Sequence, residues 1–289
     1  MIGKSRTLLA PLFGLAVLLC VLFATPQAYA VTIERVLSLG GIEAWLVRDH
    51  TNPIITMRFA FRGGAALDPE GREGLANMVS TLLDEGAGDL DSKIFQGRLE
   101  DLVITLRFDA GRDNFGGRLR TLVENKATAF ELLTLALTRP RFDAEPLERI
   151  RSQIFSSLRQ EAEDPNTIAG KTLFKTLFPA HPYGRPVDGT LESVAAITQT
   201  DLKGFVKRRL AKDNLAIGVV GDITAEAFRN DPFNLWLFGK FAGIRNLFHL
   251  QARRIYVPRG YSYSLGDQGA CMWMLPGGEA SFSLRDYAA

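Results

Sequence analysis

The chain has 289 residues, of which 46% are hydrophobic and 23% are charged, and this composition is typical of a globular protein rather than a collagenous, low-complexity or disordered one. It contains 34 basic and 32 acidic residues, and two of the basic ones, Lys4 and Arg6, stand in the first thirty positions. The remainder therefore has 32 of each sign and no net charge. A neutral chain gives no electrostatic reason to expect binding to nucleic acid or to an anionic membrane.

The first thirty residues have the pattern of a secretory signal peptide. A basic start with Lys4 and Arg6 precedes an apolar run from Leu8 to Ala24 and the small-residue ending Ala28-Tyr29-Ala30. The apolar run is shorter than the roughly 20 residues of a membrane span, so an uncleaved anchor is the less favoured alternative. We expect residues 1–30 to be removed and the mature chain to have no membrane attachment.

Few residues remain that commonly bind metals. Without the signal, Cys271 is the one cysteine, which excludes an intrachain disulfide and any zinc site built from two or more cysteines. His50, His181 and His249 lie far apart in the sequence, so a histidine site would have to be assembled by the fold. We expect His50, in the turn Asp49–Pro53, to be a solvated loop residue, and we assign no role to His249.

Hydrophobic periodicity predicts an α+β fold. The alternation in Ile55–Arg62 is typical of a strand with one buried face, and apolar residues from Leu75 to Leu83 recur at helical spacing. Further helices are predicted over 92–102, 127–138, 146–162 and 200–210, and further strands over 103–108, 115–122 and 215–220. This order of elements predicts helices packed on one face of a mostly antiparallel sheet.

The composition changes near residue 228. Residues 228–289 hold 12 aromatic residues among 62, whereas residues 31–227 hold 13 among 197, so the aromatic density rises about threefold. The tail has little strand or helix periodicity. We therefore divide the chain into a signal peptide (1–30), a folded domain (31–227) and an atypical aromatic-rich tail (228–289). The tail is interpreted as frame-shifted, foreign or truncated sequence, and an aromatic-rich second domain is the alternative.

Several segments resemble the pitrilysin/insulinase-type metallopeptidases. Leu37–Asp49, Arg62–Ala65 and Gly74–Gly86 are similar, in this order, to the start of a peptidase domain of that family. The resemblance continues through Pro140–Asp143, Glu163–Pro165, His181–Gly184, Gly189–Thr190, Ile197–Thr198, Asp201–Leu202 and Asn214–Asp222. It covers about Ile33–Asp222, and the order and spacing of these motifs together are specific. It implies the fold of a single peptidase domain of this family and, as in its exported bacterial members, a periplasmic location.

The residues that perform the chemistry in active members are replaced. Those members have the inverted motif H-x-x-E-H on the first helix, with two histidines that bind zinc and a glutamate that acts as general base. This chain has Asn77, Ser80 and Thr81 at these positions. The alignment places Ser156 and Ser157 where the family has a further glutamate ligand. Asn, Ser and Thr are poor zinc ligands and no base remains, so we predict no catalytic residue, no metal site and no cofactor in this chain.

Other polar groups receive structural interpretations. Asp84, Glu85 and Asp89 are interpreted as a solvated acidic face, because the regular oxygen-ligand loop of a calcium site is missing. The pair Gly63-Gly64 is not followed by the Lys-Ser/Thr of a phosphate-binding loop, so nucleotide binding is unsupported. His181 resembles a structural position of the family, with a role in lining a substrate surface as the lesser possibility.

The resemblance implies a non-catalytic subunit. Peptidases of this family often work as pairs of similar domains, in which one keeps zinc and the other keeps the fold and part of the substrate chamber. The expected partners are an exported zinc-peptidase homologue, forming a heterodimer, and a peptide substrate. Two alternatives stay open: a truncated or decayed gene product with no independent function, and an active zinc peptidase that takes its ligands from elsewhere in the chain.

Limited proteolysis is expected to remove most of Phe228–Ala289 quickly while Val31–Asp222 persists. An aromatic-rich segment without clear periodicity is a poor candidate for a core of its own, and exposed chain is cut first. Mass spectrometry of the fragments measures the boundary. A protease-resistant full-length species would contradict the prediction.

Overall fold

The computed structural model describes residues 32–37, 42–230, 271–274 and 280–283. The chain divides into two compact units, Met1–Ile244 and Arg245–Ala289. The described elements of the first unit are β1 Ile33–Leu37, β2 Glu43–Arg48, β3 Ile54–Arg62, η1 Ala65–Leu67, α2 Leu75–Leu82, α3 Ser92–Asp101, β4 Thr105–Ala110, β5 Asn114–Leu122, η2 Val123–Asn125, α4 Lys126–Thr138, α5 Ala144–Glu161, α6 Pro165–Leu177, η3 Pro182–Gly184, α7 Leu191–Ala196, α8 Gln199–Arg209, η4 Lys212–Asn214, β6 Leu215–Gly221 and α9 Ala225–Arg229. The second unit has the antiparallel pair β7 Cys271–Met274 and β8 Ala280–Ser283.

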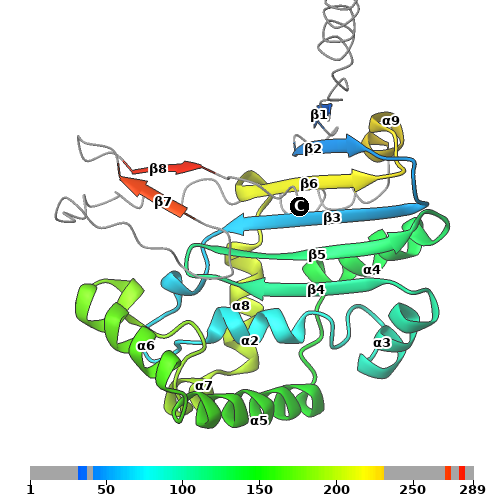
Figure 1. The fold of residues 1–289 in the computed structure, drawn as a ribbon. Coiled ribbons are helices and arrows are strands. Elements are labelled where there is room, and N and C mark those ends of the chain that lie inside the picture. Colours follow the sequence, from blue (N-terminus) through cyan, green and yellow to red (C-terminus); the bar gives the residue numbers. More distant parts are fainter. Residues whose placement is uncertain (1–31, 38–41, 231–270, 275–279, 284–289) are drawn as a thin grey trace, which may run out of the picture. The chain divides into compact units, whose positions relative to one another are not determined.

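The first unit contains a six-stranded sheet in the order β1-β2-β6-β3-β5-β4 (Figure 1). Four of its five strand pairs are antiparallel, and β2 with β6 is the parallel pair. Because β6 follows α8 in the chain and inserts between β2 and β3, a late segment completes the middle of the sheet. The predicted α+β class, with helices on one face of a mostly antiparallel sheet, is confirmed.

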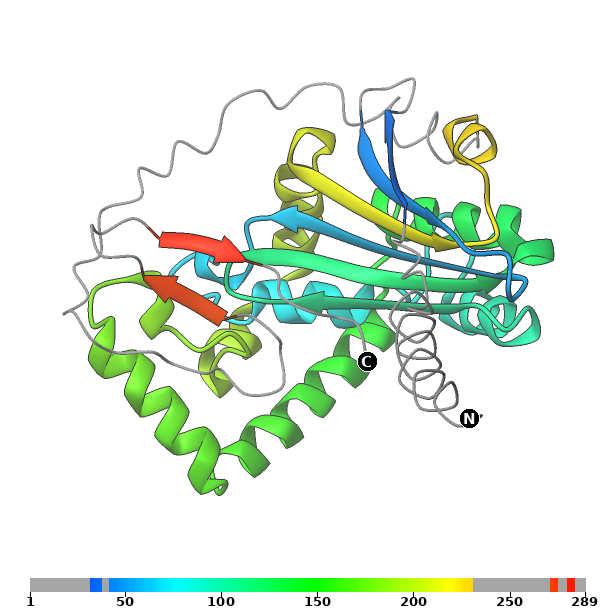
Figure 2. The ribbon, with the colours of Figure 1, turned by 45° about the horizontal axis from the view of Figure 1, so that its top comes forward.

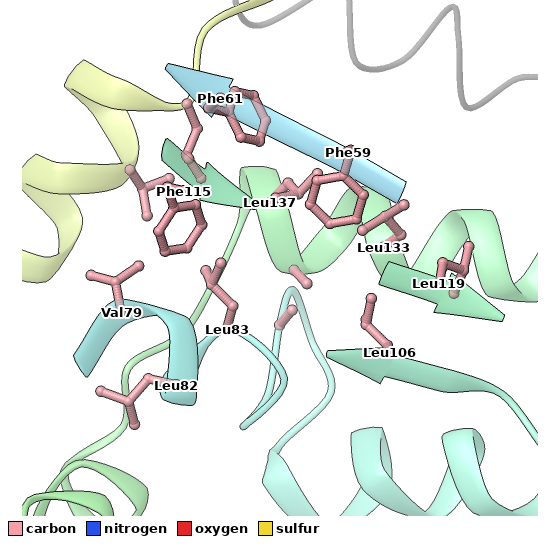
Figure 3. Packing of buried hydrophobic residues seen from close by; sticks show 14 of the residues in the cluster. Phe59, Phe61, Val79, Leu82, Leu83, Leu106, Phe115, Leu119, Leu133 and Leu137 are labelled. Atoms are coloured by element: carbon pink, nitrogen blue, oxygen red, sulfur yellow. The ribbon is translucent and has the colours of Figure 1, made fainter. Parts of the chain in front are cut away.

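One face of the sheet is buried by helices. In β3 the side chains of Ile55, Met57, Phe59 and Phe61 are buried, whereas the residues between them are partly or fully exposed. Figure 3 shows Phe59 and Phe61 together with Leu133 and Leu137 of α4, in the same apolar cluster as Val79 and Leu82 of α2. Each fully buried side chain of this size contributes roughly 1.5–3 kcal/mol. The period of two in the sequence thus places one face of the strand in the core.

The helix α6 differs from the sequence-based prediction. The dipeptide Asp164-Pro165 was expected to mark the end of a helix, and it also begins the next one. The side chain of Asp164 accepts hydrogen bonds from the backbone N–H groups of Asn166 and Thr167, and proline at the first helical position lacks an N–H that would need a partner. The helices α5 and α6 therefore meet at an angle (Figure 2).

The start of α8 and the end of the folded domain also differ from the predicted boundaries. Helix α8 begins at Gln199, one residue before the predicted start at residue 200. Thr198 caps this helix and forms a reciprocal capping box with Asp201. At the other end of the domain, Phe228 in α9 is 1% exposed and part of the core, so the packed chain continues beyond Ala227. The predicted signal peptide, His249 and most of the predicted tail lie outside the described residues. No helix in the described ranges combines the length and hydrophobicity of a membrane span.

A buried ion pair joins the start of α2 to the end of α8. Arg209 is 7% exposed and Asp68 is 3% exposed, and their closest side-chain atoms, Nη1 and Oδ1, are 3.0 Å apart. The guanidinium also donates to the carbonyl oxygens of Gly64 and Leu67, and the second oxygen of Asp68 accepts from the N–H of Ala76 at 3.1 Å. Burial raises the pKa of Asp68, and it lowers the pKa of Arg209.

Replacing Arg209 with alanine is expected to lower the free energy of unfolding by about 3–5 kcal/mol, because Asp68 would stay buried with its charge uncompensated. Arg208 is its exposed neighbour on α8, so Arg208→Ala is the matched control, with an expected change within about 0.5 kcal/mol. Urea denaturation followed by circular dichroism measures both. Equal shifts of the two urea midpoints would show that the buried ion pair contributes no more to stability than an exposed arginine does.

Candidate functional site

Helix α2 contains Asn77, Ser80 and Thr81, the first three positions predicted to correspond to the family's zinc motif. The helix follows Gly74, whose φ of +91° lies in the left-handed region and where a Cβ would come within 2.7 Å of the Asp188 carbonyl oxygen. Its inner face, which includes Met78 and Val79, is buried in the core. Packing of this face, together with the hydrogen bond from the Ala76 N–H to Asp68, holds α2 against the sheet.

Two of the three side chains, those of Ser80 and Thr81, bond to their own helix. Asn77 is half-buried, Ser80 is buried and Thr81 is exposed. The Ser80 hydroxyl donates to the Asn77 carbonyl oxygen at 2.7 Å, and the Thr81 hydroxyl contacts the carbonyl oxygens of Met78 at 3.0 Å and Asn77 at 3.3 Å. A hydroxyl that donates to the i−3 or i−4 carbonyl is directed along the helix rather than toward a shared ligand. These side chains offer no converging set of charged donors.

The two predicted positions on the later helix are serines, and the hydroxyl of one of them also bonds to its own helix. Ser156 and Ser157 lie in the middle of α5, which packs against α2, and both are exposed. The Ser156 hydroxyl donates to the Ser152 carbonyl oxygen at 3.0 Å. Within the described ranges, no three His, Cys, Asp or Glu residues are grouped closely enough to hold a metal ion. The assignment of these five positions to the family's zinc site stays a prediction.

The acidic residues after α2 differ from their predicted role. Asp89 is exposed, but the side chains of Asp84 and Glu85 are 11% and 13% exposed, so a solvated face was the wrong interpretation for these two. Glu85 accepts from Arg149 of α5 at 2.5 Å, and Asp84 lies 3.3 Å from Arg107 of β4. Burial raises the pKa of Asp84. These acids connect α2 to its neighbours.

The two described histidines are part of local structure. His50 follows β2 and its Nδ1 is hydrogen-bonded to the carboxylate of Asp222, which follows β6, so the parallel pairing of these strands brings them together. The His50 side chain is 61% exposed, as expected for a loop residue. His181 caps η3 by accepting from the N–H of Tyr183. The Tyr183 hydroxyl donates to Asp113 at 2.5 Å, and burial together with this bond raises its pKa.

The structure also has a feature that the sequence-based prediction missed. A hollow of about 550 Å³ lies on the face of the sheet opposite the core, and its lining includes Arg58 of β3 with Arg118 and Arg120 of β5. The signal was present in the alternation of β3 and in Arg118-Leu119-Arg120, where every second residue faces one side. What the sequence did not provide was the register that places these strands next to each other.

Comparisons with known proteins relate the chain to peptidases. No family model matches. The Helicobacter pylori protein named non-peptidase homolog YmxG is 29% identical over 209 residues, which are 72% of this chain and 48% of that protein. A Mycobacterium leprae protein named uncharacterized zinc protease ML0855 is 32% identical over 95 residues, 33% of this chain and 21% of that protein. The crystal structure of a peptidase M16 inactive domain from Pseudomonas fluorescens superimposes with a TM-score of 0.68 at 24% identity, covering 73% of this chain and 51% of that one.

The described fold is therefore that of an M16 peptidase domain. The chain is similar to a protein named non-peptidase homolog and to one named zinc protease, and its sequence has no H-x-x-E-H motif. This confirms the resemblance found in the sequence. The chain spans about half the length of YmxG and about a fifth of ML0855.

The purified chain is expected to bind zinc no better than background and to leave unstructured peptides uncut. Asn77, Ser80, Thr81 and the serines of α5 provide neither good ligands nor a base. Elemental analysis after dialysis and a peptide-cleavage assay test this. One equivalent of zinc with chelator-sensitive cleavage would refute it. Asn77→His alone should not create activity, because ligands and base act together and their effects are strongly non-additive.

Proposed function

We propose that this protein is a non-catalytic, substrate-binding subunit that pairs with an active zinc peptidase of the same family. The observation that supports this most directly is a peptidase-domain fold in which the hydroxyls of Ser80, Thr81 and Ser156, at expected zinc positions, bond to their own helices. A domain of this kind can hold and orient a peptide, while the zinc-bound water comes from the partner. We further propose, from the signal pattern of residues 1–30, that the pair forms after export to a periplasm.

The edge strand β4 offers a way to bind peptide. It is the last strand of the sheet, and it packs against α2. In the described part of the chain β5 is its one partner strand, so the outer edge of β4 is open to an added strand. Main-chain hydrogen bonds to an edge bind extended peptides of many sequences, and the side chains on either side supply selectivity. We infer that substrate binding by this subunit uses the edge of β4.

The pairing is tested by purification from the native host. A tagged copy of this chain is expected to recover an exported homologue that retains H-x-x-E-H, and the recovered pair is expected to cleave an extended peptide in a chelator-sensitive manner. Deleting the gene for this chain should lower the peptidase activity of the partner, because the partner loses half of the substrate-binding surface. Mass spectrometry identifies the partner, and a fluorogenic peptide measures cleavage.

The control is a partner in which the glutamate of H-x-x-E-H is changed to glutamine. This change should abolish cleavage and leave the association intact, which assigns the chemistry to the partner and the binding to the pair. If no such homologue is recovered and the activity is unchanged by the deletion, a decayed gene product becomes the better explanation.

A further inference from the structure

The face of the sheet that the helices leave uncovered carries a row of arginines. In the register of β3 and β5, Arg58 lies directly opposite Arg118, and Thr56 lies directly opposite Arg120. Residues directly opposite each other on neighbouring strands share one face and have Cβ atoms about 5 Å apart. All three arginines are exposed. The pairing thus gathers three positive charges around the hollow described above.

These charges are not neutralised by the rest of the described chain. Arg58, Arg118 and Arg120 form no ion pair with another described residue, although many other arginines do, as in the pair of Arg35 with Glu43. Asp49 is the one carboxylate that lines the hollow, against three arginines. Like charges on directly opposite residues destabilise a sheet, and guanidinium groups bind carboxylates through paired hydrogen bonds. An anionic ligand would remove this repulsion.

The arginines are continuous with an exposed apolar surface. Trp45 of β2 lies opposite Gly218 of β6, and Gly218 lies opposite Arg58. A second hollow of about 220 Å³ is lined by Trp45, Gly218 and Arg58, so Arg58 borders both hollows. Trp45 is 45% exposed, and Val220, at the border of the first hollow, is 48% exposed. Exposed Trp next to Arg is typical of the centre of binding surfaces.

The length of this surface suits an extended peptide. Neighbouring strands lie about 4.8 Å apart, so the row from Trp45 through Gly218 and Arg58 to Arg118 spans about 14 Å. An extended chain rises about 3.3 Å per residue, so about four or five residues would cover the row. A single small anion would contact one end of it and leave Trp45 exposed.

Charge excludes two other occupants. A second copy docked through the same face would set arginines against arginines, which costs binding energy. The segments outside the described residues have eight basic and four acidic residues, so they do not supply the missing negative charge. The occupant is therefore a different, acidic polypeptide.

We propose that the uncovered sheet face binds an extended acidic peptide, with carboxylates on Arg58, Arg118 and Arg120 and an apolar side chain against Trp45. This deepens the proposed function, on which it rests in taking the peptide to be a substrate of the paired peptidase, and it adds the sheet face as a second contact surface besides the edge of β4. The binding itself needs neither partner nor zinc, so it is measured on this chain alone, separately from the pairing.

Fluorescence anisotropy of the full chain tests the proposal with a short labelled peptide that contains Glu, Leu and Ser. The same peptide with Gln in place of Glu is expected to bind at least about tenfold more weakly, since charge-assisted contacts are lost. Binding should weaken with increasing salt, because the arginines are exposed. Absence of binding to the acidic peptide, or equal binding of the Gln peptide, would overturn the proposal.

Two variants locate the binding. The triple variant Arg58→Gln, Arg118→Gln, Arg120→Gln is expected to bind the acidic peptide at least about tenfold more weakly, with unchanged circular dichroism. Gly218→Val is expected to weaken binding by filling the second hollow, and it should fold because a Cβ at this glycine meets no atom within 4 Å.

The matched control removes three exposed arginines from helices of the other layer: Arg98→Gln, Arg159→Gln, Arg208→Gln. It has the same change in net charge and should bind within about twofold of the unaltered chain, because long-range charge effects are screened. An equal loss in the control would show a non-specific charge effect and overturn the proposal. Displacement of the peptide by inorganic phosphate, but not by chloride at the same ionic strength, would assign the site to a small anion and also overturn it.

Discussion

The buried ion pair of Arg209 and Asp68 is the interaction on which the placement of α2 depends. Asp68 uses one carboxylate oxygen for Arg209 of α8 and the other for the N–H of Ala76, at the start of α2. Either charge alone would be strongly destabilised at this depth, because burial opposes both ionised forms. The two charges therefore fix the loop around η1 and the two helices in one arrangement. A displacement of any one of these elements would break contacts to the other two.

This arrangement explains what holds α2 in the fold independently of the predicted zinc positions. In small zinc-dependent domains the metal supplies folding energy, whereas here α2 is held by the buried pair and by core residues such as Val79 and Leu82. The buried Ser80 hydroxyl has a partner in the Asn77 carbonyl oxygen, so it carries no penalty of an unsatisfied polar group. The contacts that hold α2 therefore differ from those that the predicted zinc positions make, and we expect substitutions at exposed Thr81 to leave the fold in place.

The sequence predicts elements whose signals are local and misses features that depend on pairing. The helix at Leu75–Leu82 and the strand at Ile54–Arg62 follow from their apolar periods, and the fold class follows from their order. The start of α6 was missed because Asp-Pro ends one helix and begins the next with the same two residues. The burial of Asp84 and Glu85 could not be predicted, because their arginine partners lie 23 and 64 residues away in the sequence.

The charge of a surface likewise depends on how strands pair and cannot be read from composition alone. Residues 31–289 include equal numbers of acidic and basic residues, and this balance excludes a large net charge without excluding a charged face. Many of the acids are used in ion pairs such as Glu43 with Arg35 and Glu85 with Arg149, where each cancels one arginine locally. The arginines of β3 and β5 have no such partner among the described residues, so the register of two strands gives a chain of neutral composition a surface with more positive than negative charge. A balanced composition is therefore compatible with a local excess of positive charge on one face of the sheet.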